Sequence, residues 1–207
     1  MRRKIALALL LILAMAAAGC VSGIQASPYA GAVTANQIYD IRNASYWKYG
    51  VVMSAGGTNA TWNMTVNNTW RPDGESQMTA GTVGNGMDIL YDIGYNASTY
   101  RVDRMHAKGY IGDFYQDRDV SPLQIQTLPD TGLLYYFVPM QYMGNVTVKD
   151  ASGRTAGLHV FSATDNRGFT LTYWAHPAMP LPPKIEMTAR DFKITMNLLD
   201  YKLDTGD

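Results

Sequence analysis

Residues 62–67 read Trp-Asn-Met-Thr-Val-Asn, and this alternation of apolar and polar side chains decides the fold class. A period of two is typical of a β-strand with one buried face and one solvated face. The three apolar side chains therefore share the inner face of a sheet, and Asn63 and Asn67 share the outer face.

The same period recurs on both sides of this segment. Residues 47–53 place Trp, Tyr, Val and Met at every second position, and residues 87–93 repeat the pattern with Met, Ile, Tyr and Ile. Further strands follow at roughly ten-residue spacing with turn residues between them. They are expected over 100–110, 146–148, 158–161, 169–173, 185–187 and 192–198, with turns at 70–74, 96–98, 150–153 and 165–168. We expect a mainly β (α+β) fold, a single antiparallel curved sheet or half-barrel of about ten strands.

Three stretches depart from this period. Residues 34–37, Thr-Ala-Asn-Gln, fit a capping box and predict a short helix over 35–42. Residues 133–138, Leu-Leu-Tyr-Tyr-Phe-Val, are continuously apolar and fit either a strand buried on both faces or a helix. Residues 113–122 are polar and irregular, which predicts a loop.

The N-terminus has the order of an export signal. A positive start at residues 2–4 precedes an apolar run over 5–18, and small residues then lead into Cys20, the single cysteine. This order matches a secretory signal peptide. The small residues before the cysteine resemble a lipobox, where a prokaryotic lipoprotein receives a diacylglyceryl group on the thiol.

Two other interpretations of this segment stay open. Cleavage after Ala18 would leave Cys20 as an unpaired thiol in an oxidising compartment. An uncleaved anchor needs roughly 20 apolar residues, and the run here is shorter. We expect lipidation of Cys20.

These boundaries divide the chain into three parts. They are a signal peptide over 1–19, a lipid-anchored tether over 20–33 and one β-rich extracytoplasmic domain over 34–207. The expected location is the outer face of the cytoplasmic membrane.

Charge narrows the possible partners. Loss of residues 1–19 removes three of the 17 basic side chains, so 14 basic residues face 17 acidic ones, a net charge near −3. This balance argues against a nucleic-acid partner and against electrostatic attraction to acidic lipid. Because a single cysteine forms no internal disulfide, packing must hold the fold together.

Six Asn-x-Ser/Thr sequons favour the same compartment, because such sites mark surface positions of exported proteins. A lipobox together with dense sequons is typical of an archaeal cell surface. The expected glycosylation sites are Asn43, Asn59, Asn63, Asn67, Asn96 and Asn145.

The chain shows no recognisable reaction centre. Its histidines, His106, His159 and His176, are isolated from cysteine and from paired carboxylates, and we expect the first two on solvated strand faces and the third in a loop. The sequence contains no zinc-protease, nucleophile-elbow or phosphate-cradling glycine motif. We therefore expect no enzyme, no catalytic residue and no cofactor.

Two sets of acidic residues have part of the spacing of a functional site. Asp113, Asp117 and Asp119 have part of the spacing of a calcium loop, but the glycine and the terminal glutamate of an EF-hand loop are missing. Asp88 and Asp92 are spaced like an acid–base pair, although two acids on one strand are common. We expect no metal site.

Methionine and tryptophan suggest a different kind of site. Trp47, Met53, Trp62 and Met64 fall on the inner sides of two adjacent strands. Methionine is flexible and polarizable, so it suits pockets for varied apolar ligands. These four residues are the candidate ligand cavity, and a well-filled core is the other explanation for them.

Two short motifs carry a family resemblance. Residues 181–187, Leu-Pro-Pro-Lys-Ile-Glu-Met, run into Phe-Lys-Ile-Thr-Met at 192–196, and Trp-Arg-Pro-Asp stands at 70–73. Both motifs resemble turns of the LolA/LolB and mycobacterial LppX/LprG group. The resemblance implies a curved half-barrel sheet closed by helices around an apolar cavity that holds acyl chains. The chain departs from the group in having few predicted helices.

Two functions remain at this point. The first is a lipid-anchored, N-glycosylated surface protein without catalytic activity that binds an apolar or lipid ligand in a LolA-like cavity. The second is an envelope structural or interaction module, with a fully packed core, that binds glycan or surface-layer protein.

Overall fold

The computed structural model describes residues 31–71, 75–96, 102–120, 139–149, 155–166 and 168–204. The expected signal peptide, Cys20 and the apolar run at 133–138 lie outside these ranges. Within them, no helix has the length and apolar character required to cross a bilayer.

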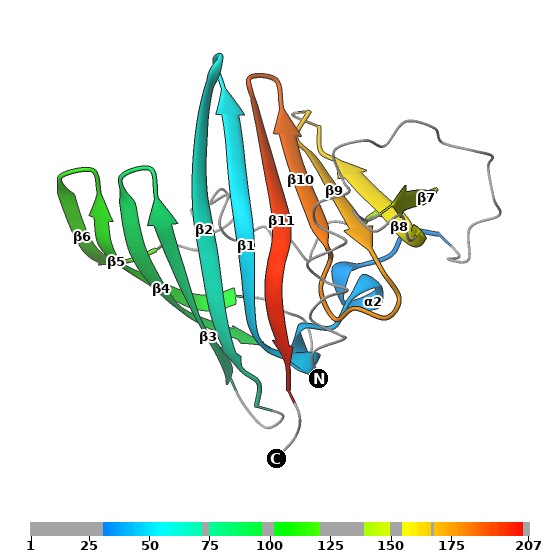
Figure 1. Ribbon diagram of the computed structural model, residues 1–207. Coiled ribbons are helices and arrows are strands. Elements are labelled where there is room, and N and C mark those ends of the chain that lie inside the picture. Colours follow the sequence, from blue (N-terminus) through cyan, green and yellow to red (C-terminus); the bar gives the residue numbers. More distant parts are fainter. Residues whose placement is uncertain are drawn as a thin grey trace.

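Eleven strands form one antiparallel sheet (Figure 1). In chain order they are β1 (Ala44–Ala55), β2 (Thr58–Thr69), β3 (Glu75–Gly84), β4 (Met87–Asn96), β5 (Val102–Ile111), β6 (Phe114–Asp119), β7 (Gln141–Lys149), β8 (Thr155–Thr164), β9 (Thr170–Ala175), β10 (Lys184–Ala189) and β11 (Phe192–Leu203).

The strand order is β6-β5-β4-β3-β2-β1-β11-β10-β9-β8-β7. Two meanders, β1 to β6 and β7 to β11, therefore meet where the first strand pairs with the last. Neither β6 nor β7 pairs with a further strand among the described residues, so the sheet is open. It is also curved (Figure 1). This architecture confirms the expected fold class, with eleven strands instead of about ten.

Alternation along the strands separates two faces. Along β2, Trp62, Met64 and Val66 are buried while Asn63 and Asn67 are exposed, which confirms the expected register. We call the buried side the inner face and the opposite side the outer face. Because antiparallel neighbours in register share a face, the buried positions of β1, β3, β4 and β11 extend the inner face across the sheet.

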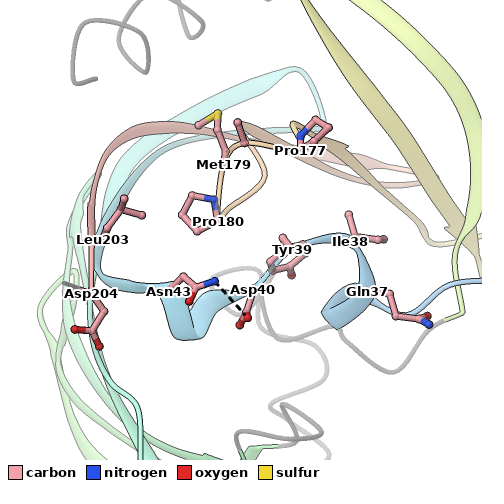
Figure 2. A pocket seen from close by; sticks show the side chains of 11 residues that line it. Gln37, Ile38, Tyr39, Asp40, Asn43, Pro177, Met179, Pro180, Leu203 and Asp204 are labelled. Carbon is pink, nitrogen blue, oxygen red and sulfur yellow. Dashed lines mark hydrogen bonds between the residues drawn. The ribbon is translucent and has the colours of Figure 1, made fainter. Parts of the chain in front are cut away.

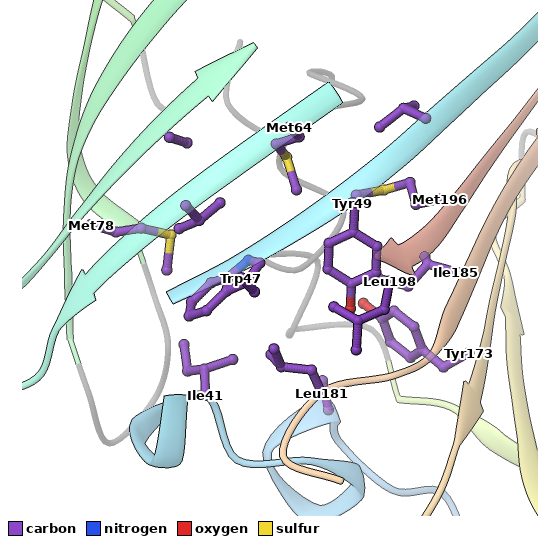
Figure 3. Packing of buried hydrophobic residues seen from close by; sticks show 14 of the residues in the cluster. Ile41, Trp47, Tyr49, Met64, Met78, Tyr173, Leu181, Ile185, Met196 and Leu198 are labelled. Carbon is purple, nitrogen blue, oxygen red and sulfur yellow. The ribbon is translucent and has the colours of Figure 1, made fainter. Parts of the chain in front are cut away.

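Two short segments cover part of the inner face. The first contains helix α2 (Ala35–Ile38) and a 3₁₀ turn, η1 (Ile41–Asn43), and it leads directly into β1. The second is the connection between β9 and β10, which places Leu181 in the core. In Figure 3, Ile41 and Leu181 lie opposite Trp47.

The helix expected over 35–42 is split in two. The Gln37 side chain accepts the Thr34 N–H at 2.8 Å, as the capping box predicts. The backbone then becomes extended at Tyr39 and Asp40, because the Asp40 carboxylate accepts the Arg42 N–H and begins a new turn.

The prediction of a loop over 113–122 is wrong for most of that stretch, because Phe114–Asp119 forms strand β6. No residue of β6 is buried, so neither face imposes an apolar period on its sequence. It is a strand because it pairs with β5 along its whole length. The pairing begins with Phe114 opposite Ile111 and ends with Asp119 opposite His106.

Candidate functional site

The inner face carries the four residues of the candidate ligand cavity. Trp47 and Met64 have 0% and 1% of their surface exposed, Trp62 is buried, and Met53 is partly buried. They belong to one hydrophobic core with Tyr49 and its neighbours on β10 and β11, drawn in Figure 3. The sequence thus places these side chains on the correct face, and their role in ligand binding stays a prediction.

Methionine is a prominent component of this core. Its long, unbranched side chain adapts to irregular partners at little strain. The buried methionines of the described residues are Met64, Met78, Met105, Met140, Met187 and Met196.

A buried polar group fixes the first cover segment to the sheet. The Asn68 amide donates to the carbonyl oxygens of Ile41 and Ala44 at 3.0 and 3.1 Å. Its own oxygen accepts the Tyr95 hydroxyl at 2.7 Å. Since buried polar groups are costly when unpaired, this arrangement holds η1 in one position over the inner face.

A second polar contact fixes the β9–β10 connection. The Tyr49 hydroxyl donates to the Pro182 carbonyl oxygen at 2.6 Å. Burial, with a smaller effect from Tyr173, raises the pKa of Tyr49 well above its ordinary range. The phenol therefore keeps its proton and remains a donor.

An open groove of about 570 Å³ lies between the two cover segments (Figure 2). One wall comes from the segment before β1, the other from the β9–β10 connection, and the end of β11 contributes Leu203 and Asp204. Its described lining consists of Gln37, Ile38, Tyr39, Asp40, Asn43, Pro177, Ala178, Met179, Pro180, Leu203 and Asp204.

The groove has a mixed lining, in which apolar side chains alternate with amide and carboxylate groups. Tyr39 meets Tyr173 of the core edge to face, with ring centroids 5.4 Å apart, so the groove adjoins the inner face. Asp40 accepts both the Nε and Nη2 hydrogens of Arg42 at 2.7 Å. Lysine and arginine are absent from the lining that the structure describes. The groove therefore offers apolar contact and hydrogen-bond acceptors.

Sequence reasoning missed this groove because its walls come from three distant segments. Of these segments, the proline-rich stretch before β10 had a recognisable motif, and that motif predicted a turn and no groove. The pairing of β1 with β11 brings the segments together.

The six sequon asparagines are all exposed. Asn63 and Asn67 lie on the outer face of β2, and Asn43 lies at the edge of the groove. Asn59 accepts from Ser54 and Asn145 accepts from Tyr142, both at 2.6 Å, and the Asn43 amide donates to an Asp40 carboxylate oxygen at 3.4 Å. Their glycosylation stays a prediction.

His106 lies on β5 between two carboxylates of β6. Its Nδ1 is 2.9 Å from an Asp119 oxygen and its Nε2 is 2.8 Å from an Asp117 oxygen. These hydrogen bonds raise the pKa of His106, and the bond from His106 lowers the pKa of Asp117. The two carboxylates lie on opposite edges of the ring, and the described residues contain no cluster suited to a metal ion.

The other two histidines lie near the second cover segment. His159 was expected on a solvated face, but it is half-buried on β8 and stacks on Phe161. His176 lies in a loop, as expected, and its Nδ1 accepts the Ala178 N–H at 3.2 Å. Burial, followed by the charge of His159, lowers the pKa of His176.

Comparison with known proteins gives structural likenesses alone. No protein-family model matches the chain, and no curated protein sequence matches it. A DUF1329 family protein from Desulfovibrio piger is similar over 84% of this chain and 90% of its own, at 10% identity and a TM-score of 0.41. The MucA/MucB complex of Pseudomonas aeruginosa is similar over 84% of this chain and 57% of its own, at 14% identity and a TM-score of 0.43. Likenesses at this level assign neither family nor function.

Proposed function

We propose that this chain is a lipid-anchored, non-enzymatic surface protein that binds the hydrocarbon part of an amphiphile against the inner face of its curved sheet. One observation carries the proposal. A wide, methionine-rich inner face adjoins an open groove, and the described cover consists of two short segments.

The geometry supports a route for such a ligand. The groove lies beside Tyr39, and Tyr39 contacts Tyr173 of the inner face. Movement of either cover segment would extend the groove towards Trp47, which lies opposite Ile41 and Leu181 of the two cover segments (Figure 3). Methionine side chains suit this role because they repack around different chain shapes.

The anchor at Cys20 places the protein on the outer face of the cytoplasmic membrane. Two acyl chains on one cysteine supply the pair of hydrophobic attachments that stable anchoring needs. Cys20→Ser is expected to release the protein from isolated membranes, and continued retention after a carbonate wash would contradict the anchor.

Glycans on the outer face would leave the inner face free for the ligand. We expect sugar on Asn63 or Asn67, because both side chains project from the exposed side of β2. Glycopeptide mass spectrometry of native material tests this. Bare asparagines at both positions, with sugar elsewhere on the chain, would contradict it.

Quenching of tryptophan by 9,10-dibromostearate tests ligand binding at the inner face. In the full chain carrying Cys20→Ser, Trp70→Phe with Trp174→Phe leaves the inner-face pair, Trp47 and Trp62. The matched control, Trp47→Phe with Trp62→Phe, leaves the tryptophans outside the inner face.

Bromine quenches at short range, so the proposal predicts saturable quenching of the inner pair and little quenching of the control. Equal quenching of both variants would indicate non-specific adsorption. An unquenched inner pair would favour the second function, a packed envelope module that binds glycan or surface-layer protein.

A further inference from the structure

Large apolar side chains gather at one exposed corner of the sheet, away from the groove. The described residues include ten exposed large hydrophobic side chains, and six of them lie on two neighbouring hairpins, β3–β4 and β5–β6. Phe114 is the most exposed of all, at 82%. We call this set the hairpin corner: Val83, Leu90, Tyr110, Ile111, Phe114 and Tyr115.

Strand register shows how the hairpin corner is arranged. Ile111 is paired with Phe114, so both project to the inner side at the rim of the sheet. Tyr110 is paired with Tyr115, and their rings lie 5.2 Å apart on the outer side. The tip of β5–β6 therefore carries large side chains on both of its faces. This hairpin lies at one edge of the sheet (Figure 1).

Hydrogen bonds within the hairpin corner fix its conformation in the absence of a partner. The Gly112 N–H donates to the Gly86 carbonyl oxygen at 2.6 Å and joins the two hairpin tips. His106 bridges β5 to Asp117 and Asp119 of β6, and the Tyr115 hydroxyl donates to Asp117 at 3.0 Å. A pre-organised apolar surface loses little conformational entropy on binding. Exposed apolar surface that is gathered in this way marks an interaction site.

The charges at the corner indicate the chemistry of the partner. Asp113 lies in the turn between Ile111 and Phe114, and Asp88 is paired with Tyr110. Neither carboxylate forms an ion pair with another described residue, whereas Lys108 is paired with Asp117 at 3.5 Å. The corner therefore presents aromatic rings together with uncompensated negative charge.

A lipid bilayer fits this surface poorly. Insertion of the tip would carry Asp113 into the bilayer, and a carboxylate is unfavourable there. Acidic lipid headgroups would add repulsion. A protein surface with a lysine or arginine beside an apolar pocket would pair with the carboxylate and accept the rings.

We propose that the hairpin corner is a docking site for a protein partner that presents a basic side chain within an apolar pocket. The Phe114 ring fills the pocket, and Asp113, next to it in the turn, pairs with the cation. Asp88, beside Tyr110 on the outer side, adds negative charge to the corner. This docking is independent of ligand binding at the inner face.

Site-specific photo-crosslinking in the source cells tests the proposal with the full, membrane-anchored chain. The photoreactive residue p-benzoylphenylalanine replaces Phe114 in one variant and Val52 in the control. Val52 is a suitable control because it is exposed on the outer face of β1, outside the corner. The Phe114 probe is expected to yield a discrete protein adduct that the Val52 probe does not yield.

Charge variants decide whether the adduct reflects the proposed chemistry. With the Phe114 probe in place, Asp88→Lys with Asp113→Lys is expected to reduce the adduct roughly tenfold, because a like charge now faces the partner's cation. The pair Asp88→Asn with Asp113→Asn keeps the shape of the turn and is expected to give an intermediate loss. Circular dichroism checks that the sheet persists in both.

Four outcomes would overturn the proposal. The first is a lipid adduct at Phe114 in place of a protein adduct, which would make the corner a membrane contact. The second is equal labelling from the Val52 probe, and the third is no adduct at Phe114. The fourth is a protein adduct whose yield charge reversal does not change.

Discussion

The β1–β11 pair at the centre of the sheet and the β5–β6 hairpin at its edge are both antiparallel, yet different forces hold them. Trp47, Tyr49 and Leu198 of the central pair are buried beneath the two cover segments. In β6 no residue is buried, and its side chains are joined to β5 by the His106 bridge. The central pair therefore depends on apolar burial, and the edge hairpin depends on backbone pairing and charge.

The largest loss of unfolding free energy is expected from truncating a side chain that is completely buried. Trp47→Ala removes a side chain with no exposed surface, and such a truncation costs about 3–5 kcal/mol of unfolding free energy. Urea denaturation of the full chain carrying Cys20→Ser measures it. Val52→Ala, on the exposed face of the same strand, is the control and should change the free energy by about 0.5 kcal/mol or less. Equal losses would contradict the assignment of faces on β1.

A smaller loss of unfolding free energy is expected from removing the hydrogen bonds that hold the first cover segment to the sheet. Asn68→Ala leaves the Ile41 and Ala44 carbonyl oxygens and the Tyr95 hydroxyl without their partner, which costs about 1–3 kcal/mol. Amide exchange in residues 35–43 should accelerate more than exchange in β11. Asn67→Ala, at the exposed neighbouring position, is the matched control. Unchanged exchange in residues 35–43 would show that Asn68 does not fix this cover segment.

The smallest effect is expected at the edge hairpin, and it depends on pH. The folded pKa of His106 is raised, so its stabilising effect is full below the ordinary value of 6.5 and is lost as pH rises through the folded pKa. The folded pKa of Asp117 is lowered, so its effect is present above about 3.8 and is lost as pH falls through the folded pKa. Protection of β6 amides should therefore be greater near pH 5.5 than near pH 8.5.

The variant His106→Gln tests whether the bridge causes this difference. It should remove the pH dependence of β6 protection while amides of β1 and β11 remain unchanged. A dependence that persists in His106→Gln would place its origin elsewhere.

This contrast also explains what the sequence could predict. Where one face is buried, as in β2, the period of two gives both the strand and its orientation. Along β6 neither face is buried, so Asp117, Arg118 and Asp119 resemble a loop in sequence, and only the pairing with β5 reveals the strand.

The sequence alone also could not predict contacts between segments that are far apart along the chain. The capping box at residues 34–37 was visible because it is local. The break at Asp40, the bonds of Asn68 and the groove depend on partners far along the chain, which no short motif specifies. The sequence predicted the correct face for the four candidate residues on β1 and β2, whereas it gave no indication of the groove.

Native mass spectrometry tests the central claim, that the inner face binds an apolar ligand. The full chain carrying Cys20→Ser is incubated with a lipid extract from its own source and separated from free lipid. A stoichiometric adduct that is lost when Met64→Asp places a charge on the inner face is the predicted result, provided that circular dichroism shows the sheet intact. A ligand-free mass for the parent chain, or an adduct that Met64→Asp leaves unchanged, would contradict it.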